Sequence, residues 1–549
     1  MARTAQHPVS FTSGRSSLVP DGTSILDAAQ LVGEPIPTEC GGRGACGRCI
    51  VAVLGGAVPD YCREGEDGGV PLVLSCQTPV HGPLTVRSAD EAEPSPLAAR
   101  AEHAGADALA SFAPWPLGLD PIAAAGDGDL GVAVDVGTTT LQLLLLDLGS
   151  GTVLAEAAAY NPQIPHGADV ITRIVAAERG LLPELTASVR ATIAAMLTDA
   201  AARSAPGIAE SELAGRIRAY VVAGNLTMVH LLLGQDPSGI RRVPSEPRAL
   251  SFDPVRASDL GWPGGKALVH TIPAVGGWVG GDIVAGLVRA GLSRARDGLS
   301  LYVDLGTNGE VAFGGADFAL ACACSAGPAF EGGGIRCGMR ADAGAVDGAR
   351  IDVERGVIEL STIGGAPARG VCGSGLIALA DALFRAGWVD RAGRLGERLP
   401  AALRVEGDWG DGIRLGDGLT LFERDLASLV RAKGAIFSGI RSLHRSLGEG
   451  AGPVRRVIVS GNFGRYLNLP AAVGIGLLPD LPPSDFGYVH NGSLEGATLA
   501  LLSRDFREQL AAYAARITYV DLSELPGYMD EFVGACFLPH TSPELLRLR

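Results

Sequence analysis

Positive charge and long apolar runs are both scarce in this chain of 549 residues. Lys and Arg total 45 against 60 Asp and Glu, and the net charge of −15 argues against a nucleic-acid-binding surface, which requires a basic footprint. No apolar run approaches the roughly 18 residues that a membrane-spanning helix needs. Residues 1–10 also lack the apolar segment of a secretory signal. We therefore expect a cytoplasmic protein that binds neither nucleic acid nor membrane.

Charged residues are few as well, at 19%, whereas apolar residues make up 47% and leave ample material for large cores. A chain of this length implies several domains. The stretch 89–127 is acidic, alanine-rich and interrupted by proline, which is typical of a linker. We accordingly predict an N-terminal domain over 1–88, a linker over 89–127, a middle region over 128–215 and a C-terminal domain over 216–549.

Ten cysteines are present, and in a chain without a secretory signal they are more often ligands or buried thiols than disulfides. Four of them follow the spacing C-x5-C-x2-C and then, after 26 residues, a fourth: Cys40, Cys46, Cys49 and Cys76. Plant-type [2Fe–2S] proteins use C-x4-C-x2-C…C, so the first gap here is one residue longer. A zinc site is the alternative, but structural zinc sites usually have two C-x2-C pairs and this stretch has one.

Three further cysteines have no assigned role. Cys62 lies in the N-terminal domain and is expected to be a surface or half-buried thiol. Cys322 and Cys324 alternate in a predicted strand, so their side chains point to one face. We expect both to be buried thiols, because no second pair of metal-ligating residues is near them in the sequence.

A short motif of strand, Asp-x-Gly-Thr turn and strand occurs twice. The first copy runs from Asp135 through Gly137, Thr138 and Thr139, and the second, 169 residues later, is centred on Asp304. Turns of backbone N–H groups form anion-binding concavities, and carboxylates that hold Mg²⁺ through water complete a nucleotide phosphate site. The repeat therefore predicts two turns that face each other across a nucleotide-binding cleft; the second turn comprises Asp304, Gly306, Thr307, Asn308 and Glu310.

Other segments predict ordinary α/β elements with polar residues at their ends. A strand ends at Gly224-Asn225 and leads into a helix on which His230 is expected to lie in the core. Gly373-Ser374-Gly375 precedes a long helix, but it lacks the G-x-S-x-G pattern of a hydrolase serine. A second long helix, over 425–443, carries Lys433. The strand 457–459 runs into a glycine turn that contains Gly461, Asn462 and Gly464.

Taken in order, these motifs resemble the reductive activators of corrinoid-dependent methyltransferases. The resemblance covers nearly the whole chain and also includes Asn161-Pro162-Gln163, Gly167-Ala168-Asp169, Ala326 to Gly332 and the Asn491 turn. It implies an α+β and α/β multidomain architecture, with an N-terminal β-grasp ferredoxin-like domain. A duplicated, actin-like (ribonuclease H-like) nucleotide-binding fold of the acetate/sugar kinase, heat-shock ATPase and actin superfamily would follow.

The resemblance also implies ligands and a function. The four cysteines at 40, 46, 49 and 76 would hold a [2Fe–2S] cluster, and ATP with Mg²⁺ would bind the two Asp-x-Gly-Thr turns together with Gly373, Lys433, Gly461, Asn462 and Gly464. The protein would return an inactive Co(II) corrinoid protein to Co(I) with one electron, assisted by ATP. An upstream low-potential reductant and a homodimer through the C-terminal domain are further implied. No catalytic residue is assigned.

Two other functions stay open at this point. A small-molecule kinase with a redox-sensing ferredoxin domain would need a catalytic base, for which Asp169, Asp282 and Glu310 are candidates. A simple ferredoxin-type electron carrier would have no affinity for ATP. An activator of a radical dehydratase does not fit, because those proteins share a [4Fe–4S] cluster across a dimer.

Overall fold

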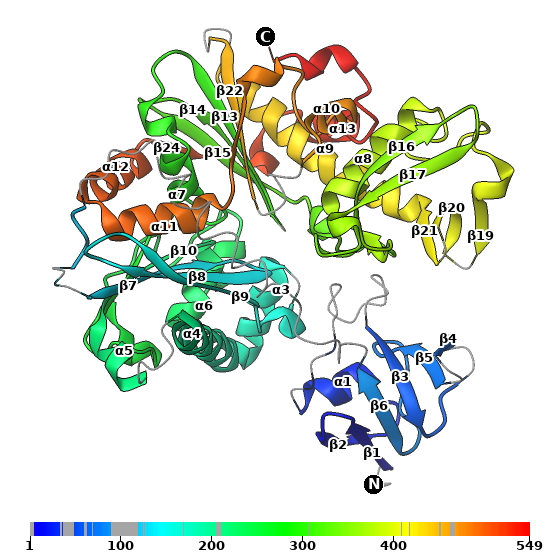
Figure 1. Ribbon diagram of the computed structural model, residues 1–549, viewed down its shortest axis with the longest axis horizontal. Helices are drawn as coiled ribbons and strands as arrows, with labels where there is room; N and C mark the ends of the chain where they lie inside the picture. The colour runs from blue at the N-terminus through cyan, green and yellow to red at the C-terminus, as the bar shows by residue number, and fades with distance from the viewer. Residues whose placement is uncertain are drawn as a thin grey trace.

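The computed structural model describes residues 5–32, 34, 36, 49–59, 63–67, 70–88, 119–123, 126, 128–167, 169–204, 210–306, 308–407, 409–416, 418–448, 452–461 and 467–548. Figure 1 shows the N-terminal domain as a separate unit beside two larger lobes. In the part of the chain so described, no helix has the length and apolar character that a membrane crossing requires.

The N-terminal domain is a mixed sheet with one helix against it, the β-grasp arrangement that was predicted. Its sheet has the order β2-β1-β6-β3-β5-β4. The helix begins where Ser24 Oγ accepts the backbone N–H of Asp27 at 3.0 Å, as expected for an N-cap. The elements are β1 (Gln6–Phe11), β2 (Ser16–Pro20), α1 (Ile25–Gln30), β3 (Ile50–Gly55), β4 (Arg63–Asp67), β5 (Val70–Leu74) and β6 (Leu84–Ser88).

The second sheet begins with the strand that leads into Asp135. β7 (Leu130–Val136), β8 (Thr140–Asp147) and β9 (Val153–Tyr160) form an antiparallel meander. The next two strands run parallel to β7: β10 (Ile217–Gly224) pairs with β7, and β12 (Leu268–Thr271) pairs with β10. Residues 216–271, assigned by prediction to the C-terminal domain, thus contribute two strands and the short β11 (Val255–Arg256) to this sheet.

The third sheet repeats this arrangement around Asp304. β13 (Leu299–Leu305), β14 (Gly309–Gly314) and β15 (Ala319–Cys324) form the meander. β22 (Val454–Ser460) and β23 (Phe486–Val489) are added in parallel beside β13, and β24 (Ile517–Tyr519) pairs with β15. Each sheet therefore places its Asp-x-Gly-Thr turn between its first and second strands, which confirms the predicted duplication.

Two helices lie between the second and third sheets. α7 (Gly281–Arg289) and α11 (Gly492–Leu502) share one hydrophobic core with Val221 of β10 and with Ile458 of β22. Most buried positions of both helices are apolar or glycine, and the buried Arg289 of α7 pairs with Glu495 of α11 at 2.6 Å. In Figure 1 they lie where the two lobes meet. This shared core joins the two lobes.

The outer faces of the two sheets are covered by separate helices. On the second sheet these are α3 (Val170–Ala176), α4 (Leu182–Ser204) and α6 (Leu226–Leu233), while α5 (Glu210–Arg216) leads into β10. His230 of α6 is fully buried, as predicted. On the third sheet α8 (Gly373–Arg385), α9 (Glu423–Ser446) and α10 (Leu469–Gly474) fill this role. α12 (Arg504–Ala514) packs on α7, and α13 (Tyr528–Ala535) packs on α9.

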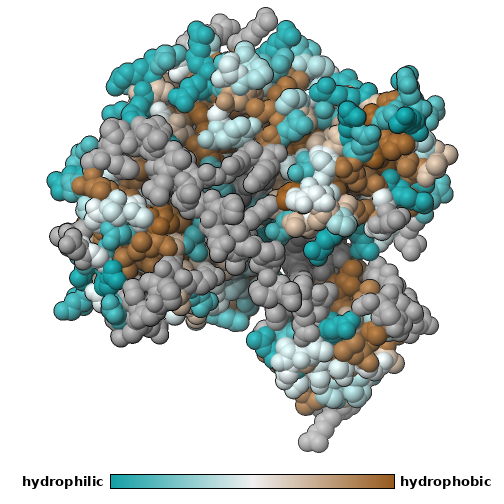
Figure 2. Space-filling model, in the orientation of Figure 1, coloured by the Kyte–Doolittle hydropathy of each residue, from teal (hydrophilic) through white to brown (hydrophobic). Residues whose placement is uncertain are grey.

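Two small sheets extend the lobe that holds the third sheet. One contains β16 (Ala345–Asp352), β17 (Val357–Thr362) and β18 (Gly370–Val371), and the other contains β19 (Arg404–Gly407), β20 (Gly410–Gly416) and β21 (Leu419–Phe422). Figure 2 shows hydrophilic residues along the outer rim of this lobe, with apolar residues among them. The predicted elements around residues 373, 425 and 457 are confirmed as α8, α9 and β22.

Candidate functional site

Two of the four predicted cluster ligands meet at one end of the N-terminal domain. Cys49 immediately precedes β3 and Cys76 follows β5, and their Sγ atoms lie 3.2 Å apart without a disulfide. The backbone N–H of Ser75 donates to Cys49 O at 2.8 Å and holds the two segments together. The hydrogen bond with Cys76 lowers the pKa of Cys49 to about 6. A pair of converging thiols, one already biased toward thiolate, fits a shared iron atom; Cys40, Cys46 and Cys62 lie outside the described residues.

The first turn lies at the carboxyl end of β7, and its aspartate is held by α11. Asp135 Oδ1 accepts the hydroxyl of Ser493 at 2.7 Å, and Asp135 Oδ2 accepts the Nδ2 of Asn491 at 2.9 Å. Gly137 cannot be another residue, because a Cβ there would lie 2.5 Å from Thr140 O. Thr138 is buried, and Thr139 is half-buried beside it. The turn is thus a tight, supported structure next to a fixed carboxylate.

The second turn occupies the corresponding place in the third sheet. Asp304 pairs with Ser460 of β22 and with Glu310 of β14 in the strand register. Its Oδ2 accepts the hydroxyl of Tyr302 at 3.1 Å. Gly461 follows Ser460 with φ of +113° and lies so close to Leu305 that a Cβ would be 2.4 Å from Leu305 O. The strand register therefore brings Asp304 beside the end of β22, where the predicted glycine turn begins at Gly461.

The remaining predicted residues of these turns divide into two groups. Gly306 and Asn308 are half-buried between β13 and β14. Thr307, Asn462 and Gly464 lie outside the described residues.

Four carboxyl groups lie near the two turns, and the charges of Asp135, Asp282 and Asp304 act on neighbouring members of this group. Burial raises the pKa of Asp135 to about 6, with a further contribution from Asp304. Burial, then Asp135 and Asp304, raise the pKa of Asp282 to about 7. Burial also raises the pKa of Asp304, and that of Glu310 well above its usual range. Such a cluster favours a bound cation, which would let all four ionise together.

The geometry of this cluster favours a hydrated cation over a directly ligated one. Within the described ranges, no three His, Cys, Asp or Glu side chains converge closely enough to ligate a metal ion themselves. Mg²⁺ usually keeps several of its waters and takes only one or two carboxylates. The residues present therefore fit a hydrated Mg²⁺ that accompanies a phosphate group.

Two predicted nucleotide ligands have partners within the protein itself. Lys433 is fully buried on α9, and its Nζ donates to Phe537 O at 2.5 Å and to Pro539 O at 2.6 Å. Burial lowers the pKa of Lys433 to about 7. Gly373 begins α8 where a Cβ would lie 1.8 Å from Phe330 O. The structure thus gives Lys433 a link to the C-terminal segment and gives Gly373 a close approach of two backbones.

Several polar residues around the cleft gave little signal in the sequence. Asn491 and Ser493 reach Asp135 across more than 350 positions, and the only local sign of them is an N-cap pattern. Asp169, a candidate base, is instead the N-cap of α3, where its Oδ1 accepts the N–H of Thr172 at 2.8 Å. Of the three candidate bases, the structure leaves Asp282 and Glu310 in the cleft.

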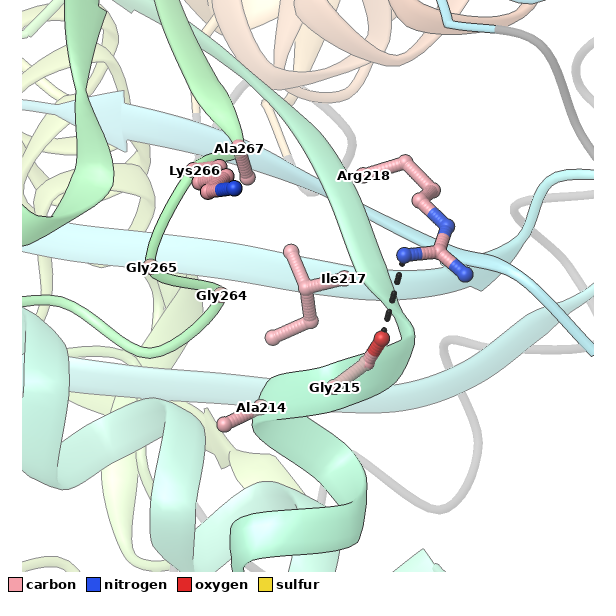
Figure 3. Close-up of a pocket in the computed structure, with 8 residues that line it drawn as sticks. All are labelled: Ala214, Gly215, Ile217, Arg218, Gly264, Gly265, Lys266 and Ala267. Atoms are coloured by element: carbon pink, nitrogen blue, oxygen red, sulfur yellow. Dashed lines mark hydrogen bonds between the residues drawn. The ribbon is translucent and has the colours of Figure 1, made fainter.

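A separate hollow lies beside the first residues of β10 in the second sheet (Figure 3). It is lined by the start of β10 and by the turn 264–267, so it is at the end of β10 away from the cleft. Arg218 within it donates to Gly215 O at 3.1 Å, as Figure 3 shows, and its Nε donates to Asp129 at 2.8 Å. The guanidinium of Arg218, the arginine that lines this hollow, is therefore already paired within the protein.

Comparison with known proteins covers all three parts of the chain. Residues 12–81 match the 2Fe-2S iron-sulfur cluster binding domain, residues 130–295 match the RACo middle region, and residues 298–548 match the C-terminal domain of RACo, the ASKHA domain. A solved structure of a reductive activator for a corrinoid, iron–sulfur protein is 33% identical, with a TM-score of 0.69, and the match covers 98% of this chain and 99% of that one.

Curated relatives give the same picture. The corrinoid activation enzyme RamQ of Eubacterium limosum is 30% identical over 421 residues, which are 73% of this chain and 69% of that protein. The [Co(II) methylated amine-specific corrinoid protein] reductase of Methanosarcina barkeri is 26% identical over 270 residues, which are 45% and 46% of the two chains.

The fold and the sites define an iron–sulfur protein fused to a nucleotide-binding domain of the actin-like superfamily. Within that class, the chain belongs to the RACo family of corrinoid activators. The family predicted from the cysteine spacing and the repeated turns is therefore confirmed.

Proposed function

We propose that this protein is an ATP-dependent reductive activator, which passes one electron to a corrinoid protein and returns its cobalt from Co(II) to Co(I). The observation that carries this proposal is the presence in one chain of a converging Cys49–Cys76 pair and of a cleft with two Asp-x-Gly-Thr turns. The relatives named above act on corrinoid proteins, which supports a corrinoid protein as the electron acceptor.

Each part of the chain has a distinct task in this proposal. A plant-type [2Fe–2S] cluster, when bound, supplies a one-electron donor with a potential of about −400 mV. The cysteines at 40, 46, 49 and 76 hold it, and of these Cys49 precedes β3 and Cys76 follows β5. The two turns bind the phosphates of ATP, with Asp135 and Asp304 holding Mg²⁺ through water. α7 and α11 join the two lobes, so closure of the cleft on the nucleotide moves the lobes relative to each other.

ATP can assist the transfer only through its different affinities for two states of the protein. In this proposal the closed state has the higher affinity both for ATP and for the Co(II) corrinoid protein. An upstream low-potential reductant refills the cluster. We further propose that two copies associate through the C-terminal domain; light scattering of the purified protein at micromolar concentration tests this, and a monomeric mass would contradict it.

The function is tested by anaerobic absorbance spectroscopy of a Co(II) corrinoid protein from the same cells. The protein and a low-potential reductant are added, with or without ATP and Mg²⁺. We expect the Co(I) band to grow only with ATP, and to be lost in Cys46→Ala and in Asp304→Ala. Ser258→Ala, an exposed change in the turn that follows β11, is the control and should retain full activity.

Other outcomes would favour different functions. Full activity without ATP, and in Asp304→Ala, would indicate a simple electron carrier. A cluster that is reduced while cobalt stays Co(II) with every corrinoid protein tried would contradict the proposal and direct the search to phosphoryl acceptors.

A further inference from the structure

The first turn is held from behind by three hydrogen bonds to successive backbone carbonyls. Gly137 O accepts Asn161 Nδ2 at 2.8 Å, and Thr138 O accepts Arg173 Nη2 at 2.5 Å. Thr139 O accepts the backbone N–H of Asn161 at 2.9 Å. The donors come from the Asn161-Pro162-Gln163 stretch and from α3, two segments to which the proposed function gives no role. We call residues 137–139 the phosphate turn.

This support fixes the direction of the peptide groups of the phosphate turn. In a planar trans peptide the C=O and the N–H point in opposite directions. The N–H of Thr138 shares a peptide with Gly137 O, so it points away from Asn161. The N–H of Thr139 shares a peptide with Thr138 O, so it points away from Arg173. Donors behind a turn thereby orient N–H groups on its other side, which is how backbone concavities attract anions.

Arg173 adds a charge to this arrangement. Its side chain is 0% exposed, and its other hydrogen bonds go to Gly167 O at 2.9 Å, to Gln163 Oε1 at 3.4 Å and to the sulfur of Met228 at 3.1 Å. None of these partners is a carboxylate. A buried guanidinium without a paired anion is costly to a fold.

The carboxylate that acts on Arg173, Asp169, also accepts a hydrogen bond at the start of α3. Among the described residues, Asp169 is the carboxylate close enough to act on Arg173, and its Oδ1 caps α3. The net effect of burial lowers the pKa of Arg173 to about 9, so the guanidinium stays charged at neutral pH. Through its hydrogen bond to Thr138 O, the positive charge of Arg173 therefore favours an anion on the other side of the phosphate turn.

We propose that Arg173 is a positioning residue that sets the preference of the cleft for polyphosphate nucleotides. It holds Thr138 O, polarises the peptide between Thr138 and Thr139, and places a buried positive charge behind the site of the phosphates. The phosphate groups add negative charge to that of Asp169, which acts on this guanidinium without a direct hydrogen bond to it. The inference rests on the proposed function, because it requires that the cleft binds a nucleotide.

The test compares the affinities of ATP and of adenosine for the full-length protein by isothermal titration calorimetry in the presence of Mg²⁺. The ratio measured is the dissociation constant of adenosine divided by that of ATP. In Arg173→Met this ratio should fall at least tenfold, because ATP affinity is lost while adenosine affinity stays unchanged within twofold. Arg173→Lys keeps the charge but loses the planar fork of donors, so it should restore part of the ratio.

Arg190 provides a matched control in the same lobe. It is a half-buried arginine of α4 whose Nε donates to Leu232 O at 2.7 Å, away from the phosphate turn. Arg190→Met should leave the ratio unchanged even where it lowers the melting temperature. An equal loss of ATP and adenosine affinity in Arg173→Met, or a ratio that does not change, would overturn the role of Arg173 and leave the proposed function intact.

A second measurement remains informative if Arg173→Met does not fold. The ATP affinity of Arg173→Lys should depend on ionic strength as steeply as that of the wild type, with a uniformly lower value. A shallower dependence would contradict a charge-based role. If the wild-type protein binds no ATP, the proposed function and this inference both fail.

Discussion

Individual carboxyl groups in the cleft carry much of its chemistry. Asp135, Asp282, Asp304 and Glu310 come from four different elements, and ionised neighbours within the group raise the pKa values of Asp135, Asp282 and Glu310. Their raised pKa values mean that, without a cation, the cleft retains protons at neutral pH. A hydrated Mg²⁺ would displace those protons, so we expect binding of Mg²⁺ and ATP to release protons and to strengthen as pH rises from 6 to 8.

Asp282 gives a test of this electrostatic picture. Its pKa is raised from 3.8 to about 7, so between about pH 4 and 7 the folded state keeps a proton that the unfolded state has released. The free energy of unfolding must therefore fall as pH rises through this window. The asparagine of Asp282→Asn stays neutral at every pH, so the decrease in the free energy of unfolding between pH 5 and 7.5 should be smaller by on the order of 2 kcal/mol. Urea unfolding at the two pH values, without metal or nucleotide, measures this difference. Equal slopes in the two proteins would show that Asp282 is not buried beside other carboxyl groups.

At the scale of elements, helix starts bring backbone and side chains to the cleft. α11 begins at Asn491, whose Oδ1 accepts the N–H of Leu494 at 2.9 Å while its Nδ2 donates to Asp135 and, at 2.8 Å, to Gln142. One side chain thus accepts one of the unpaired backbone N–H groups at the start of a helix and also fixes a carboxylate on another sheet. α8 begins at Gly373 for a different reason, because its backbone must approach Phe330.

The two tasks of Asn491 can be separated by comparison with Ser503, the N-cap of α12. Asn491→Ala and Ser503→Ala should each lower the free energy of unfolding by about 1 kcal/mol, since each removes an N-cap. Only Asn491→Ala should also weaken binding of ATP with Mg²⁺, about tenfold, because Asp135 then loses a donor. The measurements are urea unfolding and calorimetric titration, and unchanged ATP affinity in Asn491→Ala would limit its role to capping.

Gly373 permits a similar comparison with another helical glycine. In Gly373→Ala the new methyl group meets Phe330 O, so we expect a loss of stability of at least about 2 kcal/mol. In Gly215→Ala on α5, a Cβ meets nothing within 4 Å among the described residues, and the change should stabilise by up to about 1 kcal/mol. Both values follow from thermal or urea unfolding. A stable Gly373→Ala variant with impaired ATP binding would instead support the predicted contact with nucleotide.

At the scale of the whole molecule, the lobes are joined on one side by a core and on the other by a surface contact. α7 and α11 form the core side. The surface contact is a cation–π pair in which Arg340 Cζ lies 3.8 Å from the ring centroid of Tyr160. Tyr160 ends β9 next to Asn161, and Arg340 precedes β16, so this pair links the second sheet's lobe to the third's. A contact of this size is worth about 0.5–1 kcal/mol, enough to bias a balance between open and closed lobes.

Removal of this pair should shift that balance toward the open state. Tyr160→Leu is expected to lower ATP affinity about two- to fivefold and to increase the radius of gyration of the nucleotide-free protein in small-angle X-ray scattering. Trp409→Leu removes a comparable pair, with Arg336 Cζ at 4.5 Å, inside a single lobe and is the control. If both variants behave alike, Tyr160 acts through local stability and not through closure.

Local pattern was sufficient to predict a large part of this molecule. Strands such as β7 and β13 were readable because apolar runs end at Asp-x-Gly turns, and α8 was readable because Gly373-Ser374-Gly375 stands at its start. The roles of Lys433 and Asp169 were not readable, because each side chain is bonded to a partner that its own sequence neighbourhood does not specify. The assignments of residues to cluster and nucleotide stay predictions that the experiments above test.

The sequence by itself determined the cysteine spacing, the repeated turns and hence the family, since these features depend only on residue type and separation along the chain. Only the tertiary structure decided which groups meet: Asn491 and Ser493 at Asp135, Arg173 behind Thr138, and four carboxyl groups in one cleft. The physical reason is that these contacts are set by how α3, α7 and α11 pack against two sheets. That packing is governed by shared apolar surface, which holds polar groups together without leaving a local mark in the sequence.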